Sequence, residues 1–396
     1  MKTELFELPT KSLEGYESPS VSALHSQQDG SILCGVSFSN PSLFRLKHDK
    51  NFVIEDLGLE EEVGSGCLGV MNGLWSATSG DTAFAVLHEG FAPGFLKKLA
   101  GGDVRGKSGP DLIKNLLEQD GGMGASVRHS VVQIVEGEFR VRRFREPGAL
   151  MDAAHIGDFI FGLCGTSIWR EPYLNAEKRE TLRKDLVGNL SFHRDGSGNF
   201  WFQGQNGRLL RMGQTDIKAK PTTQKIPKWT ESSLFEISAA SPVDEWLYGV
   251  SGDSKVLFRV RVNPVSNEEE MQVVGEFAQR ITGIAFQGEA AVSVAPTNQD
   301  QAMEQKEAPA VSEAFLAISL ESPEGAEIRL GRVTPSEDPE MSSALPALKS
   351  LGRIPGVNQI GSLTFAGKTL WAGEGRLGMG TLKDRKPRIV KITEIV

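Results

Sequence analysis

Residues 192–211 read FHRDGSGNFWFQGQNGRLLR, and this stretch contains the unit from which the fold can be inferred. A short apolar run ends at His193. It is followed by a glycine-rich turn, a second run with Trp201, an Asn-Gly pair and a third apolar run. Asp-Gly and Asn-Gly pairs between short apolar runs are typical of tight hairpin turns. The stretch therefore predicts three consecutive antiparallel strands.

The same order of strands and turns recurs along the 396-residue chain, which indicates a repeat protein. The residues predicted to close the second strand of each copy lie at positions 35, 77, 162, 203, 249, 293 and 373. Four of the six spacings fall between 41 and 46 residues, the length of one four-stranded propeller blade. We therefore predict an all-β fold, a single seven-bladed β-propeller over residues 1–396, with eight blades as the alternative.

The other two spacings, 85 and 80 residues, are nearly double and indicate either undetected blades or insertions. Residues 111–119 place Leu112, Ile113, Leu116 and Leu117 on one helical face, so we predict a small helical insertion at 90–128, in the second blade. The second long gap contains two polar, proline-containing stretches, 296–312 and 335–350, which we predict to be flexible loops.

The two ends of the sequence contain candidate strands for closing the ring. Residues 388–396 alternate apolar and polar side chains, as a half-buried outer strand does, and residues 4–8 alternate in the same way. Pairing between them in one blade would remove an open sheet edge. We therefore predict that the first and last residues share a blade.

The unit at residues 192–211 resembles the repeats of bacterial WD40-like and sensor-type β-propellers, which carry an Asp-rich turn, a glycine, a tryptophan and then a glycine hairpin. The resemblance covers residues 20–396 as architecture, and only this copy is close. The Gly-His and Trp-Asp dipeptides of true WD40 repeats are missing at the matching positions. The resemblance implies a fold and a platform for partners, and it implies no reaction.

Composition excludes several classes of protein. The 43 Lys and Arg against 51 Asp and Glu give a net charge of −8, which argues against nucleic acid as the main partner. Three widely separated cysteines, Cys34, Cys67 and Cys164, form no disulfide framework. The first residues have no signal-peptide pattern, and no apolar run is long enough for a membrane helix. We expect a soluble cytoplasmic protein that binds neither nucleic acid nor membrane.

Two groups of residues are candidates for partner binding. Residues 90–128 carry a net charge of +2, and they display Phe91, Phe95, Leu96, Lys97 and Lys98. This segment either packs on the propeller rim or docks on a partner. The second group comprises the basic residues that follow the apolar pair of the third strand in four copies: Arg45, Arg170, Arg211 and Arg259. They either form structural bonds to a neighbouring blade or form a ring that recognises an acidic partner.

Metal and nucleotide sites are weaker hypotheses. His25, His155 and His193 each lie where a first strand ends, on one predicted face, and would bind a metal only if they converged. The stretch from Gly101 to Ser108, GGDVRGKS, fits the phosphate-binding pattern GxxxxGK[ST]. Gly109-Pro110 follows at once and stops the helix that this pattern needs, so we expect a flexible basic loop. We expect no cofactor.

The sequence thus predicts a non-catalytic scaffold or adaptor for protein partners. Its binding surface would combine one disc face, the insertion at 90–128 and the loops at 296–312 and 335–350. No linear catalytic motif is present. Propeller enzymes assemble their sites from residues scattered over several blades, so a lactonase-like hydrolase or a lyase, with a metal or ligand in the central channel, is the alternative. A small-ligand sensor is a third.

Overall fold

The computed structural model describes part of the chain, and all structural statements below concern that part. The described residues are 1–10, 19–27, 29–37, 42–48, 52–59, 70–76, 82–89, 128–135, 138–144, 150–156, 159–164, 167–172, 178–183, 189–194, 200–204, 209–212, 222–224, 235–251, 253–262, 269–287, 313–336, 344–375 and 386–395.

These residues form seven four-stranded antiparallel sheets, which we number in chain order. Sheet 1 contains β2 (Ser20–Ser26), β3 (Ile32–Ser37), β4 (Ser42–His48) and β5 (Phe52–Asp56). Sheet 2 contains β6 (Val70–Ser76), β7 (Thr82–Glu89), β8 (Arg128–Val135) and β9 (Glu138–Phe144). Sheet 3 contains β10 (Leu150–Ile156), β11 (Phe159–Cys164), β12 (Ser167–Pro172) and β13 (Glu180–Arg183). Sheet 4 contains β14 (Asn189–Arg194), β15 (Phe200–Gly204), β16 (Leu209–Met212) and β17 (Thr222–Gln224).

The remaining sheets follow the same order, except for the last. Sheet 5 contains β18 (Phe235–Ala240), β19 (Leu247–Ser251), β20 (Val256–Val262) and β21 (Glu269–Glu276). Sheet 6 contains β22 (Ile281–Phe286), β23 (Ala314–Leu320), β24 (Ala326–Val333) and β25 (Lys349–Ile354). Sheet 7 contains β26 (Ile360–Ala366), β27 (Thr369–Glu374), β28 (Arg388–Thr393) and, as its outer strand, β1 (Lys2–Glu7).

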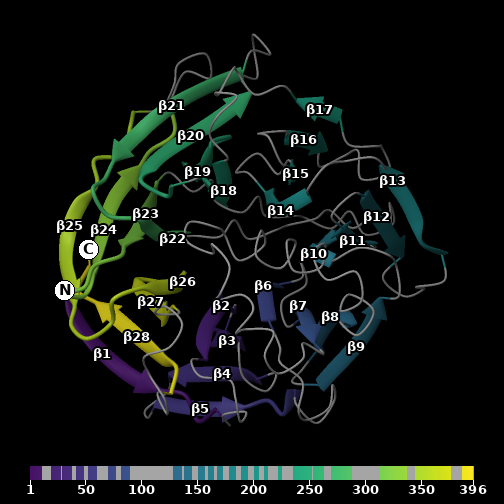
Figure 1. Ribbon diagram of the computed structural model, residues 1–396, viewed down its shortest axis with the longest axis horizontal. Helices are drawn as coiled ribbons and strands as arrows, with labels where there is room; N and C mark the ends of the chain where they lie inside the picture. The colour runs from purple at the N-terminus through teal and green to yellow at the C-terminus, as the bar shows by residue number, and fades with distance from the viewer. Residues whose placement is uncertain are drawn as a thin grey trace, which may run out of the picture.

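The seven sheets are arranged in a ring, with the first strand of each sheet nearest the centre (Figure 1). Each of these inner strands contacts the inner strand of the next sheet, and β26 contacts β2, so that the ring is closed. The prediction of an all-β propeller is confirmed. The described residues contain no helix, and none in this part of the chain could span a membrane.

A register shift recurs near the start of every inner strand. The shifts lie between residues 21/23, 71/74, 150/152, 189/191, 237/239, 281/283 and 360/362. A β-bulge inserts an unpaired residue, bends the strand and increases its local twist. Because the register shift recurs in the inner strand of every sheet, the seven sheets are copies of one structural unit. The turn sequences vary more between the sheets and reveal this repeat only in part.

Two of the predicted second strands are wrong. Residues 72–76 belong to β6, the inner strand of sheet 2, and the second strand of that sheet is β7. In sheet 6 the second strand is β23, whereas residues 288–293 lie outside the described residues. Both errors come from sheets in which a long connection interrupts the repeat, because the turn pattern alone does not distinguish a first from a second strand.

The ends of the described chain meet in sheet 7, as predicted. β1 pairs with β28 in antiparallel register from Lys2↔Thr393 to Glu7↔Arg388. The predicted outer position of residues 388–396 is wrong, because β28 is the third strand and β1 covers its edge. The physical reason lies in the side chains, since β28 is almost entirely buried whereas β1 is largely exposed.

The hydrophobic core lies between neighbouring sheets. One cluster joins sheets 5 and 6 and another joins sheets 6 and 7. A third joins sheet 7 to sheet 1 and includes Leu8, Val21, Phe44 and Trp371. The sheets approach so closely at this last junction that a Cβ on Gly373 would lie 2.3 Å from Cγ1 of Val21. Only glycine fits there.

Candidate partner-binding surfaces

The antiparallel order of the strands gives the ring two distinct faces. We call the face where the inner strands begin the start face, and the face where they end the end face. Connections from a second to a third strand, and from one sheet to the next, lie on the start face. Hydrogen bonds join such connections there, from the amide of Glu321 to the carbonyl of Arg280 (2.8 Å) and from Ser322 to Asn358 (3.0 Å).

The long connections leave from opposite faces. Residues 90–127 connect the second and third strands of sheet 2 and therefore leave from the start face. Residues 288–312 follow an inner strand and residues 334–348 follow a third strand, so both leave from the end face. Because strand direction alternates, the insertion and the two loops, which we predict to take part in binding together with one disc face, leave their strands on different faces. Residues 90–127, 296–312 and 337–343 lie outside the described residues, so their predicted helical or flexible character stays a prediction.

The four arginines occupy one position, the third strand of their sheets, and each lies opposite a second-strand residue. Arg211 pairs with Trp201 and lies 5.6 Å from its ring centroid. Arg259 pairs in the same way with Tyr248. On the other side they face the fourth strand. Arg170 donates two hydrogen bonds to Glu180 (3.0 and 2.7 Å), and Arg45 lies 3.8 Å from Glu55. The position thus carries cross-strand pairs within single sheets.

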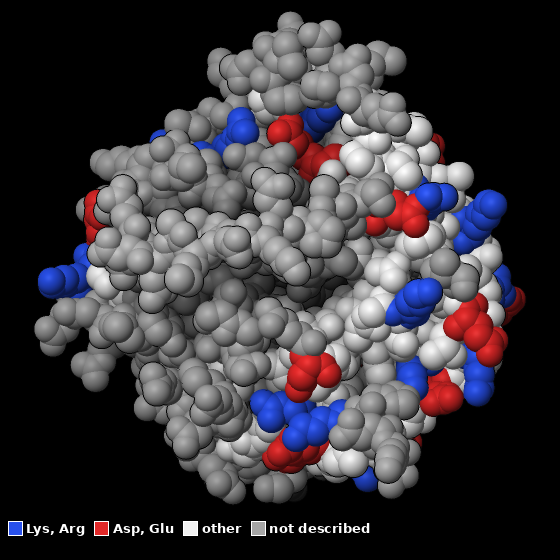
Figure 2. Space-filling view, turned by 180° about the vertical axis from the view of Figure 1, so that it is seen from behind, with Lys and Arg blue, Asp and Glu red and all other residues white. Residues whose placement is uncertain are grey.

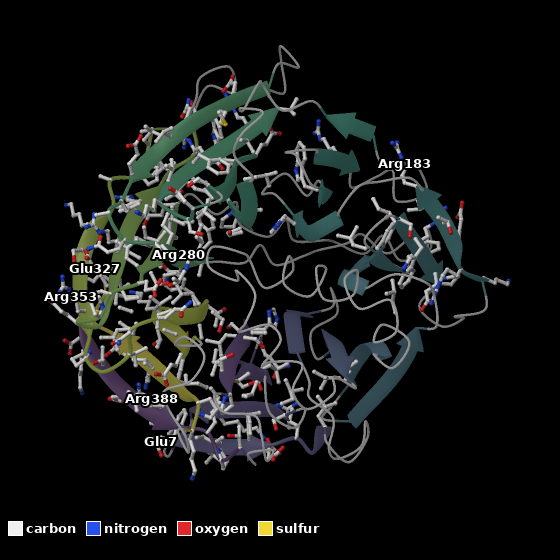
Figure 3. The ribbon with its side chains drawn as sticks, in the orientation of Figure 1. Glu7, Arg183, Arg280, Glu327, Arg353 and Arg388 are labelled. Atoms are coloured by element: carbon white, nitrogen blue, oxygen red, sulfur yellow. The ribbon has the colours of Figure 1, made fainter. Side chains whose placement is uncertain are left out.

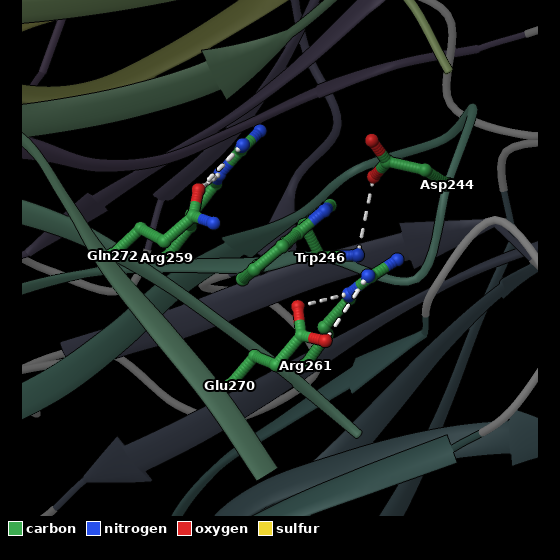
Figure 4. A network of polar contacts seen from close by, with 6 residues as sticks. All are labelled: Asp244, Trp246, Arg259, Arg261, Glu270 and Gln272. Carbon is green, nitrogen blue, oxygen red and sulfur yellow. Dashed lines mark hydrogen bonds and ion pairs between the residues drawn. The ribbon is translucent and has the colours of Figure 1, made fainter. Parts of the chain in front are cut away.

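Arg259 forms the most extensive of these networks. Figure 4 shows its hydrogen bonds to Gln272 and the nearby side chains of Trp246 and Arg261. Its guanidinium donates to the side chain of Gln272 (3.1 and 2.7 Å) and to the hydroxyl of Tyr248 (3.4 Å). It also donates a hydrogen bond to the carbonyl of Ala344 (3.4 Å), which lies in the connection between β24 and β25 of sheet 6. The indole of Trp246 lies 4.3 Å from Arg259 and 4.9 Å from Arg261. This network joins sheet 5 to sheet 6.

Burial determines which of these cations can meet a partner. Arg259 is fully buried and Arg170 is 8% exposed, so both lie in the blade interior. Burial raises the pKa of Tyr248 to about 12, although the charge of Arg259 opposes the shift. A ring of arginines that recognises an acidic partner is therefore wrong for Arg259, because a guanidinium reaches no partner when protein covers it. The structural alternative, a bond to a neighbouring sheet, holds for this residue.

Sequence reasoning missed a fifth member of the set. Lys391 follows the apolar pair Ile389-Val390 on a third strand, β28, just as the arginines follow theirs. It pairs with Trp371 and with Glu4, and its Nζ lies 6.0 Å from the Trp371 ring centroid. The pattern of two apolar residues and a cation was visible in the sequence. The alternation of residues 388–396 instead predicts an outer strand, and this prediction separates Lys391 from the third-strand cations.

The three histidines do lie near the ends of inner strands, on β2, β10 and β14, and so toward the end face. His25 is 3% exposed. Within the described residues, no group of three or more His, Cys, Asp or Glu side chains is placed to bind a metal. His25, His155 and His193 belong to three different sheets, and the side chain of His155 lies outside the described part of the structure, so the metal hypothesis stays a prediction.

Charges on the face shown in Figure 2 are mixed in sign. Lys and Arg side chains lie beside Asp and Glu side chains, and no large patch of one sign appears among the described residues of this face. In Figure 3, Arg183 lies across the ring from Arg353 and Arg388. Many of these charges are paired locally, for example Arg388 with Glu374 (2.6 Å) and Arg280 with Glu321 (3.9 Å).

The other predicted partner residues, Phe91, Phe95, Leu96, Lys97 and Lys98, lie outside the described residues. The stretch from Gly101 to Ser108 lies outside them as well. The strands on either side of the insertion are described, and Glu89 pairs directly with Arg128. Sheet 2 is therefore complete without the insertion.

Comparison with solved structures supports the fold seen in the ring of sheets. The structure of YCF48 bound to D1 peptide matches with a TM-score of 0.52 and 11% identity, over 99% of this chain and 96% of that chain. The WD40 β-propeller domain of Doa1 matches with a TM-score of 0.50 and 7% identity, over 100% of this chain and 98% of that chain. The chain is a β-propeller. No protein-family model matches the sequence, and a search of curated proteins finds no match.

Proposed function

We propose that this propeller is a non-catalytic scaffold that binds protein partners in the cytoplasm. The observation that carries the proposal is the placement of the long connections. Glu89 pairs with Arg128 and Phe286 pairs with Leu316, so the strands on either side of both connections form regular ladders. The pairing of these flanking strands does not require the long connections between them. In repeat folds, insertions of this kind concentrate on binding faces.

The charges of the connections support two different partners. Residues 90–127, on the start face, contain five Lys and Arg against four Asp and Glu, a net charge of +1. Residues 288–312 contain four acids and one lysine, and residues 334–348 contain three acids, so these two end-face connections each carry −3. Opposite faces with opposite charge fit an adaptor that holds two partners at once.

The solved neighbours fit this role. The YCF48 structure contains a bound peptide, which supports a polypeptide segment as the kind of partner proposed here. The predicted partner residues Phe91, Phe95 and Leu96 would supply apolar contacts on the start face, with Lys97 and Lys98 beside them. The net charge of −8 disfavours nucleic acid as a partner, because binding to phosphates needs an excess of Lys and Arg.

The proposal is tested by removing each connection separately. In one variant an Asn-Gly turn replaces residues 90–127 between Glu89 and Arg128, and in the matched variant a short turn replaces residues 288–312. Affinity capture from the native host should show that each variant loses its own set of partners and retains the other set. If the bound proteins are the same for both variants and for the complete chain, the scaffold proposal fails.

Metal analysis separates the scaffold from the enzyme alternative. The purified chain should contain no stoichiometric calcium or zinc. One equivalent of either metal, retained through dialysis against a weak chelator, would favour a metal-dependent propeller enzyme. The two faces should then be searched for hydrolase or lyase activity.

A further inference from the structure

The strand β1 closes sheet 7 through contacts with three sheets. Its backbone pairs with β28 over six residues, and the amide of Leu8 donates to the carbonyl of Pro387 (2.9 Å). The ring of Phe6 stacks on Phe52 of sheet 1, with 3.9 Å between centroids. At the other end, the Met1 side chain lies next to Gly352 of sheet 6, where a Cβ would be 3.4 Å from its Cε.

The connection of β1 to its own sheet is unlike that of the other outer strands. In sheets 1 to 6 the outer strand follows the third strand directly in the chain. The strand that follows β1 in the chain is β2, the inner strand of sheet 1, and nearly the whole sequence separates β1 from β28. β1 is therefore held in sheet 7 by hydrogen bonds and side-chain packing, without a hairpin.

Burial along sheet 7 is also unequal. All residues of β27 except the first are buried, and so are all residues of β28 except the first and the last. Four of the six residues of β1 are exposed, including Leu5 at 43%. Strands β26, β27 and β28 pair with one another, and their apolar cluster with sheet 6 contains no residue of β1. What β1 and Leu8 cover is the edge of β28 and an apolar cluster that includes Phe52, Trp371 and Ile389.

We propose that β1 is a displaceable latch, and that the edge of β28 and the apolar cluster beneath β1 accept this segment from a second copy of the chain. The segment is recognised as a strand that pairs with the edge of β28 and inserts Phe6 and Leu8, two residues apart, into the junction of sheets 7 and 1. Backbone hydrogen bonds supply affinity in strand addition, and alternate side chains supply specificity. The latch is independent of the scaffold proposed above.

The exchange is measured on the complete chain with a specific protease site inserted directly after Thr10. Cleavage of the folded protein leaves β1 bound as a separate peptide. A fluorescent synthetic peptide of residues 1–10 is then added in excess, and its incorporation is followed by gel filtration. We expect the labelled peptide to replace the original strand while the rest of the chain remains folded.

Two altered peptides make the test specific. The amount of captured peptide should fall at least about tenfold for the variant with Phe6→Ala and Leu8→Ala, because both side chains pack into the junction of sheets 7 and 1. The matched control, Leu5→Ala, removes an exposed apolar side chain and should be captured within about twofold of the original. Equal capture of all three peptides would overturn the proposal, as would unfolding of the chain when the original strand leaves.

The intact chain provides a second measurement. Hydrogen exchange should be at least about tenfold faster in β1 than in β21 and β25, which are outer strands that follow their third strands directly in the chain. Equal protection of the three outer strands would show that β1 does not open by itself, and would also overturn the proposal.

Discussion

The seam between sheets 5 and 6 and the seam between sheets 7 and 1 hold neighbouring sheets together in different ways. The first is a polar and aromatic network, in which Arg259 bonds Gln272, Tyr248 and the carbonyl of Ala344 beside the Trp246 ring. The second is an aromatic cluster, in which Phe6 stacks on Phe52 and both lie near Trp371, with centroids 6.4 and 5.9 Å away.

Both seams use the same position of the repeat. A third-strand cation faces a second-strand aromatic ring in each, Arg259 with Tyr248 and Lys391 with Trp371. At the first seam the guanidinium is buried and must be satisfied by several acceptors. At the second seam, the strand next to Lys391 is β1, and the apolar side chains of Phe6 and Leu8 pack between sheets 7 and 1. The repeat thus fixes the position, and the neighbouring strand fixes the kind of contact.

The largest effect should follow removal of residues 1–10. This deletion removes Leu8, which is fully buried, together with Phe6 and the cover of β28. We expect a loss of about 3–5 kcal/mol in unfolding free energy and a fall of several degrees in the melting temperature. Calorimetry provides the measurement, and Leu5→Ala, at an exposed site, is the matched control. An unchanged melting curve would show that the apolar seam does not close the ring.

A smaller effect should follow Arg259→Met at the polar seam. The substitution leaves Gln272, Tyr248 and the Ala344 carbonyl without the guanidinium, and buried acceptors without donors cost about 1–3 kcal/mol. We expect a loss of about 2 kcal/mol in urea unfolding. The same change at Arg45, whose side chain is 16% exposed, should cost less. If the two substitutions cost the same, the network across the seam adds nothing.

The polar seam should also be sensitive to alkaline pH, unlike the apolar one. Burial raises the pKa of Tyr248 to about 12, from the value near 10 of an exposed tyrosine, so the folded state holds this proton more tightly than the unfolded state. Stability is therefore complete below pH 10 and is lost as the pH rises toward 12. We expect Tyr248 to contribute about 1.4 kcal/mol to the loss of stability between pH 9 and pH 11. Tyr248→Phe should remove that part of the slope, and a parallel slope would contradict the assignment.

The smallest effect should follow Asp253→Asn, in an exposed turn of sheet 5 away from the Arg259 network. Hydrogen bonds from the Ser251 hydroxyl and the Lys255 amide lower the pKa of Asp253, so its contribution is present at neutral pH and fades as the carboxyl is protonated. The site is largely exposed, and we expect a loss of less than about 1 kcal/mol. A larger loss would mean that turns contribute to stability as much as the seams do.

The turn and strand pattern of residues 192–211 was sufficient to predict the fold. The spacing of its copies predicted blades of four strands, and the alternation of residues 388–396 and 4–8 predicted that the ends of the sequence share a sheet. The positions of Arg45, Arg170, Arg211 and Arg259 on third strands were also predictable, because apolar pairs followed by a cation recur in the sequence. These features are local, because each depends on the pattern of apolar and polar residues within a single strand and its adjoining turns.

Other features depended on how strands meet in space. The order of strands within sheet 7, the burial of Arg259, and the opposite faces from which residues 90–127 and 288–312 leave are properties of pairing and of sheet contact. Sequence periodicity specifies which residues face a sheet surface, but it does not specify which neighbour covers that surface. By itself the sequence determined a closed ring of repeated sheets. The tertiary structure alone decided which cations seal it and which strand closes it, because burial is fixed only when the neighbouring sheet is in place.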